Sequence, residues 1–423
     1  MRNRIRKVNR ALMIVLGLFI LGTIHLSMDV SAVMAEETYQ IGVLQPFSGP
    51  YAIYGEEAMA ACQVAADQIN AAGGILGRKV VLVKKDTKAE VATGIRQAND
   101  MILRDKVDAI IGPTSSSVLL GVIEVTKEHK VIHISSIANT EKATLEGIHP
   151  YYFQVVPNSY MESQAIANYL KGVDFKSYVP IALDYEWGHS TVDLLKKELQ
   201  QTKPEAKLQA EFWPPLKETN FSSYITAALN QKPDLVIGIL AGSAYQTFIR
   251  QARGYQFFDK VKFLGHGFEG DVMALGNEFP EGMRMYSRGA FYAVKSPKMD
   301  TFISDYKKIT NQYPTCWAIL SYDSLMILAD AVKKAGTIDR DAVAKALESG
   351  KFDTLRGNLS FRDLDHQMNS PEYFATSYFD KSKGFCVGKD VVVVPGESCF
   401  RSPEEIKKVR SEKNISFVPW SAR

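Results

Sequence analysis

The sequence DAIIGPTSSS at residues 108–117 indicates the fold class. A short apolar run over residues 108–111 is followed by a Gly-Pro turn and then by four consecutive hydroxyl residues. This pattern predicts a strand, a turn and the start of a helix over residues 117–128. The strand does not alternate polar with apolar residues. Strands of that kind are covered on both faces, as in a parallel sheet with helices outside it.

The same alternation of strand and helix occurs in two long sections of the chain. In the first section we predict strands over residues 41–44, 79–83, 108–111 and 131–134, and helices over residues 55–71, 90–103 and 117–128. In the second we predict strands over residues 179–183, 207–212, 234–239 and 261–264, and helices over residues 190–199, 221–229 and 244–252. Two such successions predict an α/β protein with two lobes. Helices over residues 300–310, 318–334 and 340–347 follow, then short strands up to Val394 and a charged tail from Ser402, which we expect to be peripheral.

Composition and charge fit a globular protein with no electrostatic reason to bind nucleic acid. The chain has 423 residues, of which 46% are hydrophobic and 23% are charged. The formal net charge is +3, but residues 1–35 carry five basic residues against one aspartate, a net of +4. The remainder is therefore 3 − 4 = −1. The basic character belongs to the N-terminus, and we expect no nucleic-acid partner.

The first 35 residues have the order of a secretory signal peptide. Basic residues end at Arg10, an apolar run covers residues 11–21, and Val33 and Ala35 place small residues before an expected cleavage site. The alternative is an uncleaved anchor helix over residues 11–28, which glycine and polar residues interrupt. We therefore predict a signal peptide over residues 1–35 and a periplasmic mature protein.

Export makes disulfides possible among the four cysteines. Cys62 lies on the apolar face of a predicted helix, where we expect a buried thiol. Cys386 and Cys399 flank a predicted strand and could close a short loop, although four cysteines allow three pairings. No C-x-x-C motif or Cys/His cluster predicts a zinc or redox site.

Three kinds of catalytic or cofactor site are disfavoured. Residues 265–270 match G-x-G-x-x-G after a predicted strand, but Gly276 and Pro280 stop the long helix that a dinucleotide fingerprint needs. There is no G-x-S-x-G or H-E-x-x-H motif for a hydrolase. The acidic stretch over residues 363–366 is insufficient for a closed metal site. We expect no cofactor, no metal and no catalytic residues.

Two polar turns point instead to a binding site. Residues 112–117 follow one predicted strand and residues 135–140 follow the next, so both turns lie at the same edge of the sheet. The first turn of a helix has unpaired N–H groups that favour an anion, although an ordinary N-cap would also place serine or threonine there. Ligands of open α/β sheets bind beyond the carboxyl ends of strands. Two adjacent hydroxyl-rich turns therefore favour a small anionic or zwitterionic ligand.

Several motifs resemble those of leucine/isoleucine/valine-type periplasmic binding proteins. They are IGVLQPFSGP at residues 41–50, INAAGGILGR at 69–78, IIGP at 110–113 and FIRQARG at 248–254, and the resemblance covers about residues 38–395. It implies two doubly wound parallel-sheet lobes joined by a three-stranded hinge, the type I periplasmic binding protein fold. The implied crossings lie near residues 157, 288 and 366. Lobe 1 would then contain residues 36–157 and 288–366, lobe 2 residues 158–287 and 367–400, and the tail residues 401–423.

The resemblance also implies which residues bind the ligand. Tyr54 matches a pocket tyrosine, and Trp187 stands where another is expected. Glu269 is the nearest match to the acidic residue that binds an α-ammonium group, if two residues are inserted. Ala241 stands where a further tyrosine is expected. The matches to the two polar turns are Thr114, Ser115 and Ser116, which would bind a carboxylate, and Ile137, Ala138 and Asn139.

The implied function is that of a non-catalytic solute-binding protein. It would capture a small amino acid or a related carboxylate or amide between the lobes and deliver it to the membrane permease of an ATP-binding-cassette importer. A sensory receptor of the same fold and a secreted enzyme are the alternatives. The ligand stays open among branched-chain amino acids, short amides, urea-like solutes and aromatic acids, and the changes at Trp187 and Ala241 favour something other than leucine.

Overall fold

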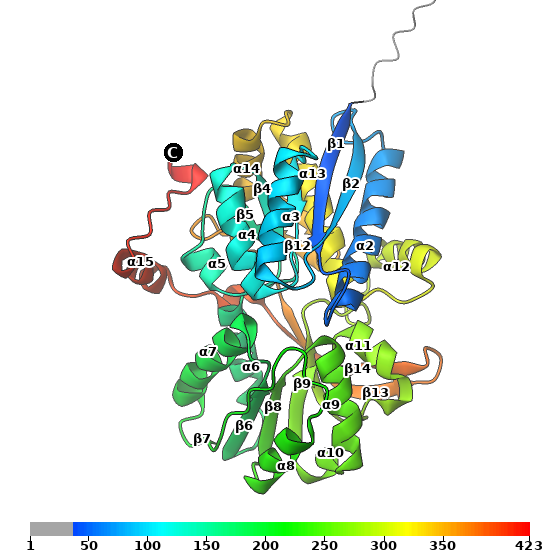
Figure 1. The fold of residues 1–423 in the computed structure, drawn as a ribbon, viewed down its shortest axis with the longest axis vertical. Coiled ribbons are helices and arrows are strands. Elements are labelled where there is room, and N and C mark those ends of the chain that lie inside the picture. The colour runs from blue at the N-terminus through cyan, green and yellow to red at the C-terminus, as the bar shows by residue number, and fades with distance from the viewer. Residues whose placement is uncertain (1–36) are drawn as a thin grey trace, which may run out of the picture. The chain divides into compact units, whose positions relative to one another are not determined.

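The computed structural model describes residues 37–423, and residues 38–423 form one compact unit. Residues 1–36, which include the predicted signal peptide, lie outside the described residues. Figure 1 shows two lobes, each built around one sheet. We name them the five-stranded lobe and the seven-stranded lobe.

The sheet of the five-stranded lobe is parallel throughout, in the order β2-β1-β3-β4-β5. Its strands are β1 (Thr38–Gln45), β2 (Lys79–Asp86), β3 (Ala109–Ile111), β4 (Ile132–Ser135) and β5 (Tyr152–Gln154). Its helices are α2 (Ala52–Ala71), α3 (Val91–Leu103), α4 (Ser116–Glu128) and α5 (Lys142–Leu145). Later residues add α12 (Pro297–Thr310), α13 (Cys316–Ala335), α14 (Arg340–Ser349) and the hairpin of β11 (Lys351–Thr354) and β12 (Gly357–Ser360). Every residue of β3 and β4 is buried, as their unbroken apolar runs predict.

The sheet of the seven-stranded lobe has the order β14-β13-β10-β9-β8-β6-β7. Its parallel part comprises β6 (Ser177–Ala182), β7 (Lys207–Leu208), β8 (Leu235–Ile239), β9 (Lys262–His266) and β10 (Arg284–Ser287). The antiparallel pair β13 (Glu372–Asp380) and β14 (Phe385–Val394) extends it beyond β10. Its helices are α6 (Ser159–Leu170), α7 (Glu186–Thr202), α8 (Ser222–Asn230), α9 (Gly242–Gly254), α10 (Phe257–Lys260), α11 (Glu269–Leu275) and the 3-10 turn η1 (Gly276–Glu278). In both sheets the strand order reverses beside the first strand, which is the topological switch point of doubly wound folds.

Two elements differ from the sequence prediction. The strand predicted over residues 207–212 is reduced to β7, which is two residues long and exposed. Beyond Leu208 the pairing with β6 is irregular, since the Gln209 amide donates to the carbonyl oxygen of Tyr178 at 3.1 Å and Phe212 forms only an isolated parallel bridge with Ile181. Helix α6 was not predicted, although Asn158 caps it by accepting a hydrogen bond from the Met161 amide at 2.9 Å.

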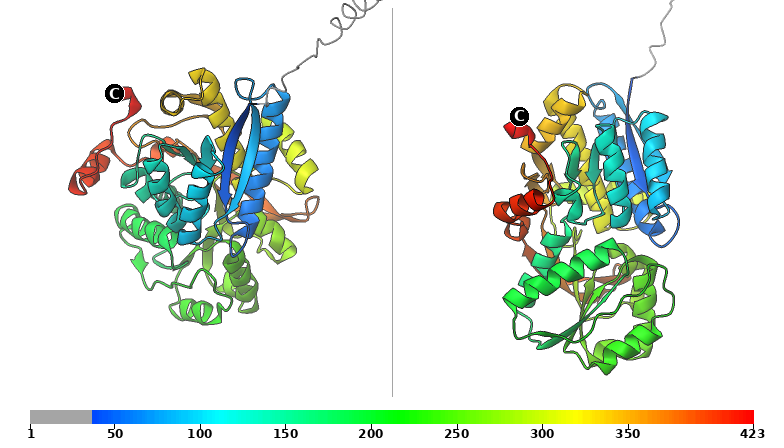
Figure 2. Two further views of the ribbon diagram at one scale, coloured as in Figure 1. Left: turned by 45° about the horizontal axis from the view of Figure 1, so that its top comes forward. Right: turned by 60° about the vertical axis from the view of Figure 1, so that its left-hand side comes forward.

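The chain passes between the lobes after β5, after β10 and before β13, where the segments lie side by side. Gln154 and Gln367 form a parallel bridge, and the Gln367 amide donates to the carbonyl oxygen of Val156 at 2.9 Å. The C-terminal residues form η2 (Gly396–Cys399), α15 (Pro403–Glu412) and η3 (Trp420–Ala422). Figures 1 and 2 show α15 and the C-terminus beside the five-stranded lobe. The tail is not merely peripheral, because Ile406 and Arg410 are buried.

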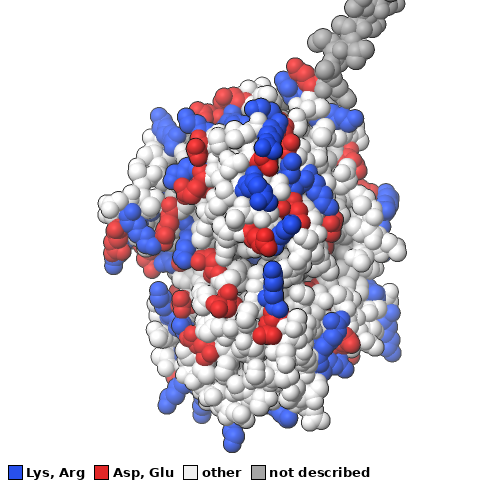
Figure 3. Space-filling model, viewed as in Figure 1, with Lys and Arg blue, Asp and Glu red and all other residues white. Residues whose placement is uncertain are grey.

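The four cysteines are free thiols in the structure, so the bridge considered between Cys386 and Cys399 is not formed. Cys62 is buried, as predicted. Within residues 37–423, none of the helices combines the length and the apolar character needed to cross a bilayer. On the face shown in Figure 3, basic and acidic side chains are interspersed over both lobes.

Candidate functional site

The candidate site is a cavity between the two lobes at the carboxyl ends of their parallel strands. From the five-stranded lobe it is lined by Tyr51, Tyr54, Thr114, Ser116, Ile137, Asn139 and Trp317. From the seven-stranded lobe and its crossing after β10 it is lined by Tyr185, Trp187, Ala241, Phe268 and Arg288. Most of these residues come shortly after a strand, because open α/β sheets present their loops at that edge.

Aromatic rings form most of the wall. The Tyr51 and Tyr54 rings are stacked with centroids 5.6 Å apart, and the Trp317 ring lies 5.3 Å from that of Tyr54. Phe268, from the opposite lobe, lies 4.4 Å from Trp317. Trp187 completes the wall beside Tyr185 at 6.0 Å. Such a wall favours a ligand with a flat apolar part.

Arg288 is the one charged side chain in this lining among the described residues. Its guanidinium carbon lies 5.3 Å from the Trp317 ring centroid, 5.5 Å from that of Phe268 and 5.8 Å from that of Trp187. Contacts of this kind stabilise a cation when water is excluded. The guanidinium is therefore held within an aromatic cage.

Glu162 of α6 lies directly behind Arg288 and neutralises it. Its carboxylate accepts hydrogen bonds from the Arg288 guanidinium, from the side-chain amide of Asn139 at 2.6 Å and from the Tyr286 hydroxyl at 2.8 Å. Burial opposes the ionised form, but Arg288 and the hydrogen-bond donors outweigh it and hold the pKa of Glu162 below its usual range. Glu162 is thus an ionised, fully buried partner of the cavity's cation.

Hydrogen bonds join the lobes around the cavity. The Tyr51 hydroxyl donates to that of Tyr185 at 2.9 Å, and the Tyr54 hydroxyl bonds to Asp271 while accepting from the Gly242 amide at 2.6 Å. These contacts leave about 20 Å³ open to the centre of a water-sized molecule, little more than one water needs. The structure is therefore a closed form, and an organic solute enters only when the lobes or the lining side chains move.

Most of the residues predicted from the sequence meet at this cavity. Those that line it are Tyr54, Thr114, Ser116, Ile137, Asn139 and Trp187. Ser115 and Ala138 are buried and do not line it. Ser115 occupies the N-cap position of α4 but makes no side-chain cap hydrogen bond, so an ordinary N-cap does not explain this serine.

Glu269 is also absent from the lining. Its carboxylate accepts hydrogen bonds from the Cys316 amide at 2.8 Å and from the Ser287 hydroxyl at 3.2 Å. Since Cys316 begins α13 of the other lobe, this carboxylate joins the lobes at a helix N-terminus. Burial raises its pKa to about 7. In the structure Glu269 connects the lobes instead of facing the cavity.

Sequence reasoning missed five lining residues: Tyr51, Tyr185, Phe268, Arg288 and Trp317. Four of them follow predicted strands or a crossing by a few residues, as Phe268 follows β9 and Arg288 follows β10. A search for aromatic or charged residues at every carboxyl strand end would have found those four. Trp317 has no such signal, because it begins a helix far along the chain.

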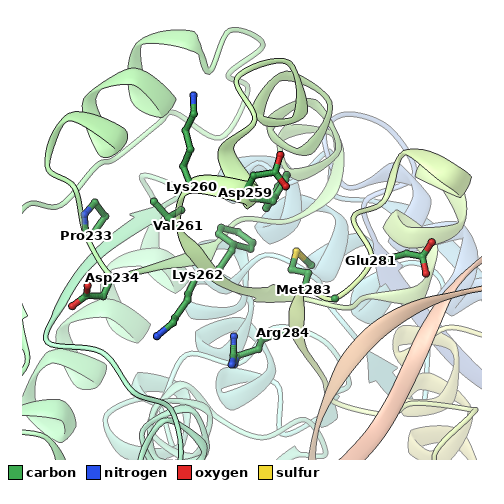
Figure 4. A pocket seen from close by; sticks show the side chains of 12 residues that line it. Pro233, Asp234, Asp259, Lys260, Val261, Lys262, Glu281, Met283 and Arg284 are labelled. Carbon is green, nitrogen blue, oxygen red and sulfur yellow. The ribbon is translucent and has the colours of Figure 1, made fainter.

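A second hollow lies at the opposite edge of the seven-stranded sheet and is shown in Figure 4. Its volume is about 440 Å³, and it is lined at the amino ends of β8, β9 and β10. Its charged groups serve local structure. Asp234 accepts from the Lys176 amide at 2.8 Å, and the Lys262 ammonium donates to the carbonyl oxygen of Asp174 at 2.5 Å. The cavity between the lobes is therefore the stronger candidate.

Comparisons with known proteins agree with this architecture. Residues 38–382 match the family model described as periplasmic binding protein. The chain is 26% identical over 335 residues to a Leu/Ile/Val-binding protein of Rhizobium johnstonii, covering 78% of this chain and 89% of that relative. A leucine-, isoleucine-, valine-, threonine- and alanine-binding protein of Pseudomonas aeruginosa is 24% identical over 342 residues. The match covers 79% of this chain and 89% of that relative.

Solved structures show the same fold at low identity. A periplasmic binding protein from Burkholderia mallei aligns with a TM-score of 0.80 at 21% identity, covering 88% of this chain and 98% of the other. A solute-binding protein of an ABC transporter from R. palustris, in complex with benzoate, aligns with a TM-score of 0.76 at 19% identity, covering 84% and 97%. With its type I fold and the family match over most of its length, the chain belongs to the periplasmic binding protein family.

Proposed function

We propose that this protein is the substrate-binding component of an ABC importer, which captures a small organic acid in the periplasm and delivers it unchanged to a membrane permease. The family match and the two-lobed fold support this proposal. The predicted signal peptide over residues 1–35 would supply the export step. We further propose that residues 36–157 with 288–366 and residues 158–287 with 367–400 are the two bodies that close over the ligand.

We propose an aromatic carboxylate as the ligand class. The observation that carries this is the lining itself, in which Arg288 lies within a cage of aromatic rings. An α-amino acid also needs an acceptor for its ammonium group. Glu269 is turned to the Cys316 amide, and Asp271 is bonded to Tyr54 and to the Gln246 amide at 2.8 Å. A ligand with a carboxylate and a flat ring fits these partners better than a zwitterion does.

Solved relatives of the same fold support this ligand class. Besides the benzoate complex, solute-binding proteins of R. palustris have been solved with 4-hydroxybenzoate and with 3,4-dihydroxybenzoic acid, both at a TM-score of 0.76. The curated relatives named for branched-chain amino acids represent the competing ligand class.

In the proposed complex the two polar turns and Arg288 hold the carboxylate. Ser116 begins α4, so the unpaired N–H groups of the first helical turn lie beside its hydroxyl. Tyr54 and Trp187, one from each lobe, would flank the ring. Closure matters because it removes water from these polar contacts and creates a joint surface for the permease.

The test is calorimetric titration with 4-hydroxybenzoate, benzoate and leucine. We expect saturable binding of an aromatic acid, and loss of that binding when Arg288→Met is combined with Glu162→Gln, so that no buried charge is left unpaired. The control is Lys196→Met with Glu211→Gln, which removes an ion pair of 2.8 Å on the surface of the seven-stranded lobe. Tight binding of leucine together with no response to any aromatic acid would refute the ligand class. Recovery of chemically altered ligand would refute the binding-protein role.

A further inference from the structure

We propose that the C-terminal segment, residues 395–423, is a fourth connection between the two lobes that limits how far they open. This goes beyond the proposed function, because it concerns the equilibrium between open and closed forms and not the ligand. The segment lies beyond the family match, which ends at residue 382. From the sequence we expect a peripheral tail and three crossings.

The connection starts on the seven-stranded lobe. β14 ends at Val394 within that sheet, and η2 then packs against α6 of the same lobe. Gly396 approaches the third crossing so closely that an added Cβ would lie 2.3 Å from the carbonyl oxygen of Ser370. The Asn369 amide also donates to Glu397 at 2.6 Å. The start of the segment is thereby fixed to the hinge.

Arg401 then contacts both lobes at once. Its guanidinium donates to Glu141 of the five-stranded lobe at 2.8 Å and lies 4.0 Å from the ring centroid of Tyr160 in α6. The Arg401 and Glu141 side chains are only 16% and 15% exposed, so loss of one partner would leave the other charge poorly solvated and unpaired. The Arg401 carbonyl oxygen accepts from Arg362 at 2.8 Å. Relative rotation of the lobes would separate Glu141 from Tyr160 and disturb these contacts.

The end of the segment is held on the five-stranded lobe at separate points. The buried Arg410 donates to the carbonyl oxygens of Leu364 at 2.7 Å and Thr144 at 3.0 Å. The backbone amides of Trp420 and Ser421 donate to the Glu348 carboxylate at 2.7 and 2.6 Å.

Aromatic contacts add to this attachment. The Phe417 ring packs edge-on against His366 with centroids 5.1 Å apart, and the Trp420 indole donates to the carbonyl oxygen of Pro150 at 2.8 Å. Figures 1 and 2 show the segment running along the side of this lobe. A chain fixed at both ends cannot follow hinge opening freely.

The physical consequence is a shift of the lobe equilibrium toward the closed form. Hinge opening is absorbed by a few residues at the crossings. A fourth crossing must deform together with the other three, and the Arg401 contacts that span both lobes are lost as they separate. Removing those contacts should therefore raise the population of open molecules without a change in ligand.

The test measures the distance between the lobes in the ligand-free protein. Spin labels on Lys345→Cys in α14 and Thr226→Cys in α8 report it by double electron–electron resonance, since both sites are exposed and the native thiols are buried. We expect Arg401→Ala and a chain ending at Phe400 to shift the distances to longer values. Lys407→Ala, an exposed position on α15, serves as the control and should leave the distances unchanged.

The outcomes separate this proposal from the proposed function. Unchanged distances in Arg401→Ala would overturn it, even if thermal stability falls, because the segment would then be structural only. If the chain ending at Phe400 fails to fold, Arg401→Ala still decides the question. Since no ligand is added, failure to find an aromatic-acid ligand does not affect the result.

Discussion

At the scale of the residue, the site depends on a cation held among aromatic rings by one carboxylate. Arg288 and Glu162 have side chains that are 3% and 0% exposed. Desolvation makes such a pair a weak source of stability as a whole, yet loss of one partner leaves the other charge buried and uncompensated. Glu162 also accepts hydrogen bonds from Asn139 and Tyr286. The bond from Asn139 connects it to the polar turn of the other lobe.

We expect Glu162→Gln to lower the free energy of unfolding by about 3–5 kcal/mol, because the isosteric amide cannot neutralise Arg288. Urea denaturation followed by circular dichroism measures this. Glu211→Gln is the matched control, since Glu211 pairs with Lys196 at 2.8 Å in a partly exposed site and should cost about 1 kcal/mol or less. Equal losses in the two variants would show that Glu162 is not the counter-charge of Arg288.

The stability of the closed form should depend on pH through the protonation of Glu269. When the lobes separate, water reaches Glu269, so the burial that raises its pKa to about 7 in the closed form is relieved. This outweighs the loss of the Cys316 amide, whose hydrogen bond lowers the pKa, and the pKa should fall toward the value of 4.5 for an ordinary glutamate. The closed form therefore binds the proton more tightly. This contribution to closure is fully present below the open-form pKa, declines above it, and is lost once the pH has risen through about 7. The neighbouring Glu57 and Asp271 have raised pKa values from burial and act with the same sign.

Affinity for an aromatic acid should thus be about tenfold weaker at pH 8 than at pH 6, from Glu269 alone. Titration calorimetry with 4-hydroxybenzoate at the two values measures the ratio. Glu269→Gln should reduce the dependence, and any remainder would come from Glu57 and Asp271. A dependence of opposite sign in the unmodified protein would contradict this account.

At the scale of the element, the two polar turns act through the start of α4. The Ser116 hydroxyl accepts a hydrogen bond from the backbone amide of Asn139 at 3.3 Å, so the turn after β3 is bonded to the turn after β4. We expect Ser116→Ala with Asn139→Ala to raise the dissociation constant for 4-hydroxybenzoate more than tenfold, at least about 1.4 kcal/mol. Calorimetry measures the change, and unchanged affinity would exclude this pocket. Ser163→Ala, at a buried hydroxyl that donates to the Ser159 carbonyl oxygen, is the control.

The sequence predicted individual strands and helices better than it predicted which residues of different elements contact one another. The runs at residues 108–111 and 131–134 became buried strands because a strand covered on both faces is apolar throughout. β7 was overestimated, because only Lys207 and Leu208 pair regularly with β6, and Phe212 returns to β6 through an isolated bridge with Ile181. Four of the twelve lining residues lie in the two polar turns predicted after strands, and two more, Tyr54 and Trp187, were identified through the family resemblance. Trp317 was not predicted, because it lies at the start of α13, far along the chain, and no sequence signal places it beside Phe268.

At the scale of the whole molecule, hydrogen bonds between the lobes determine how much of the population is closed. Tyr54 of α2 bonds to Asp271 of α11 and to the Gly242 amide at the start of α9, so one hydroxyl connects three helices across the boundary. Thr140 adds a hydrogen bond of 2.7 Å to Glu186 of α7. Each net contribution is about 1 kcal/mol. A change of that size alters a two-state population severalfold.

We expect Tyr54→Phe to increase the open population of the ligand-free protein, because the phenyl ring keeps the packing but neither donates to Asp271 nor accepts from Gly242. The spin-label pair at positions 345 and 226 should then report a larger fraction of long distances. Tyr306→Phe is the matched control, since it removes a hydroxyl from a buried tyrosine of α12 within the five-stranded lobe. If both variants gave the same distances as the parent, the Tyr54 hydroxyl would not hold the lobes together. Closure would then rest on the Tyr51, Thr140 and Glu269 contacts and on the C-terminal connection.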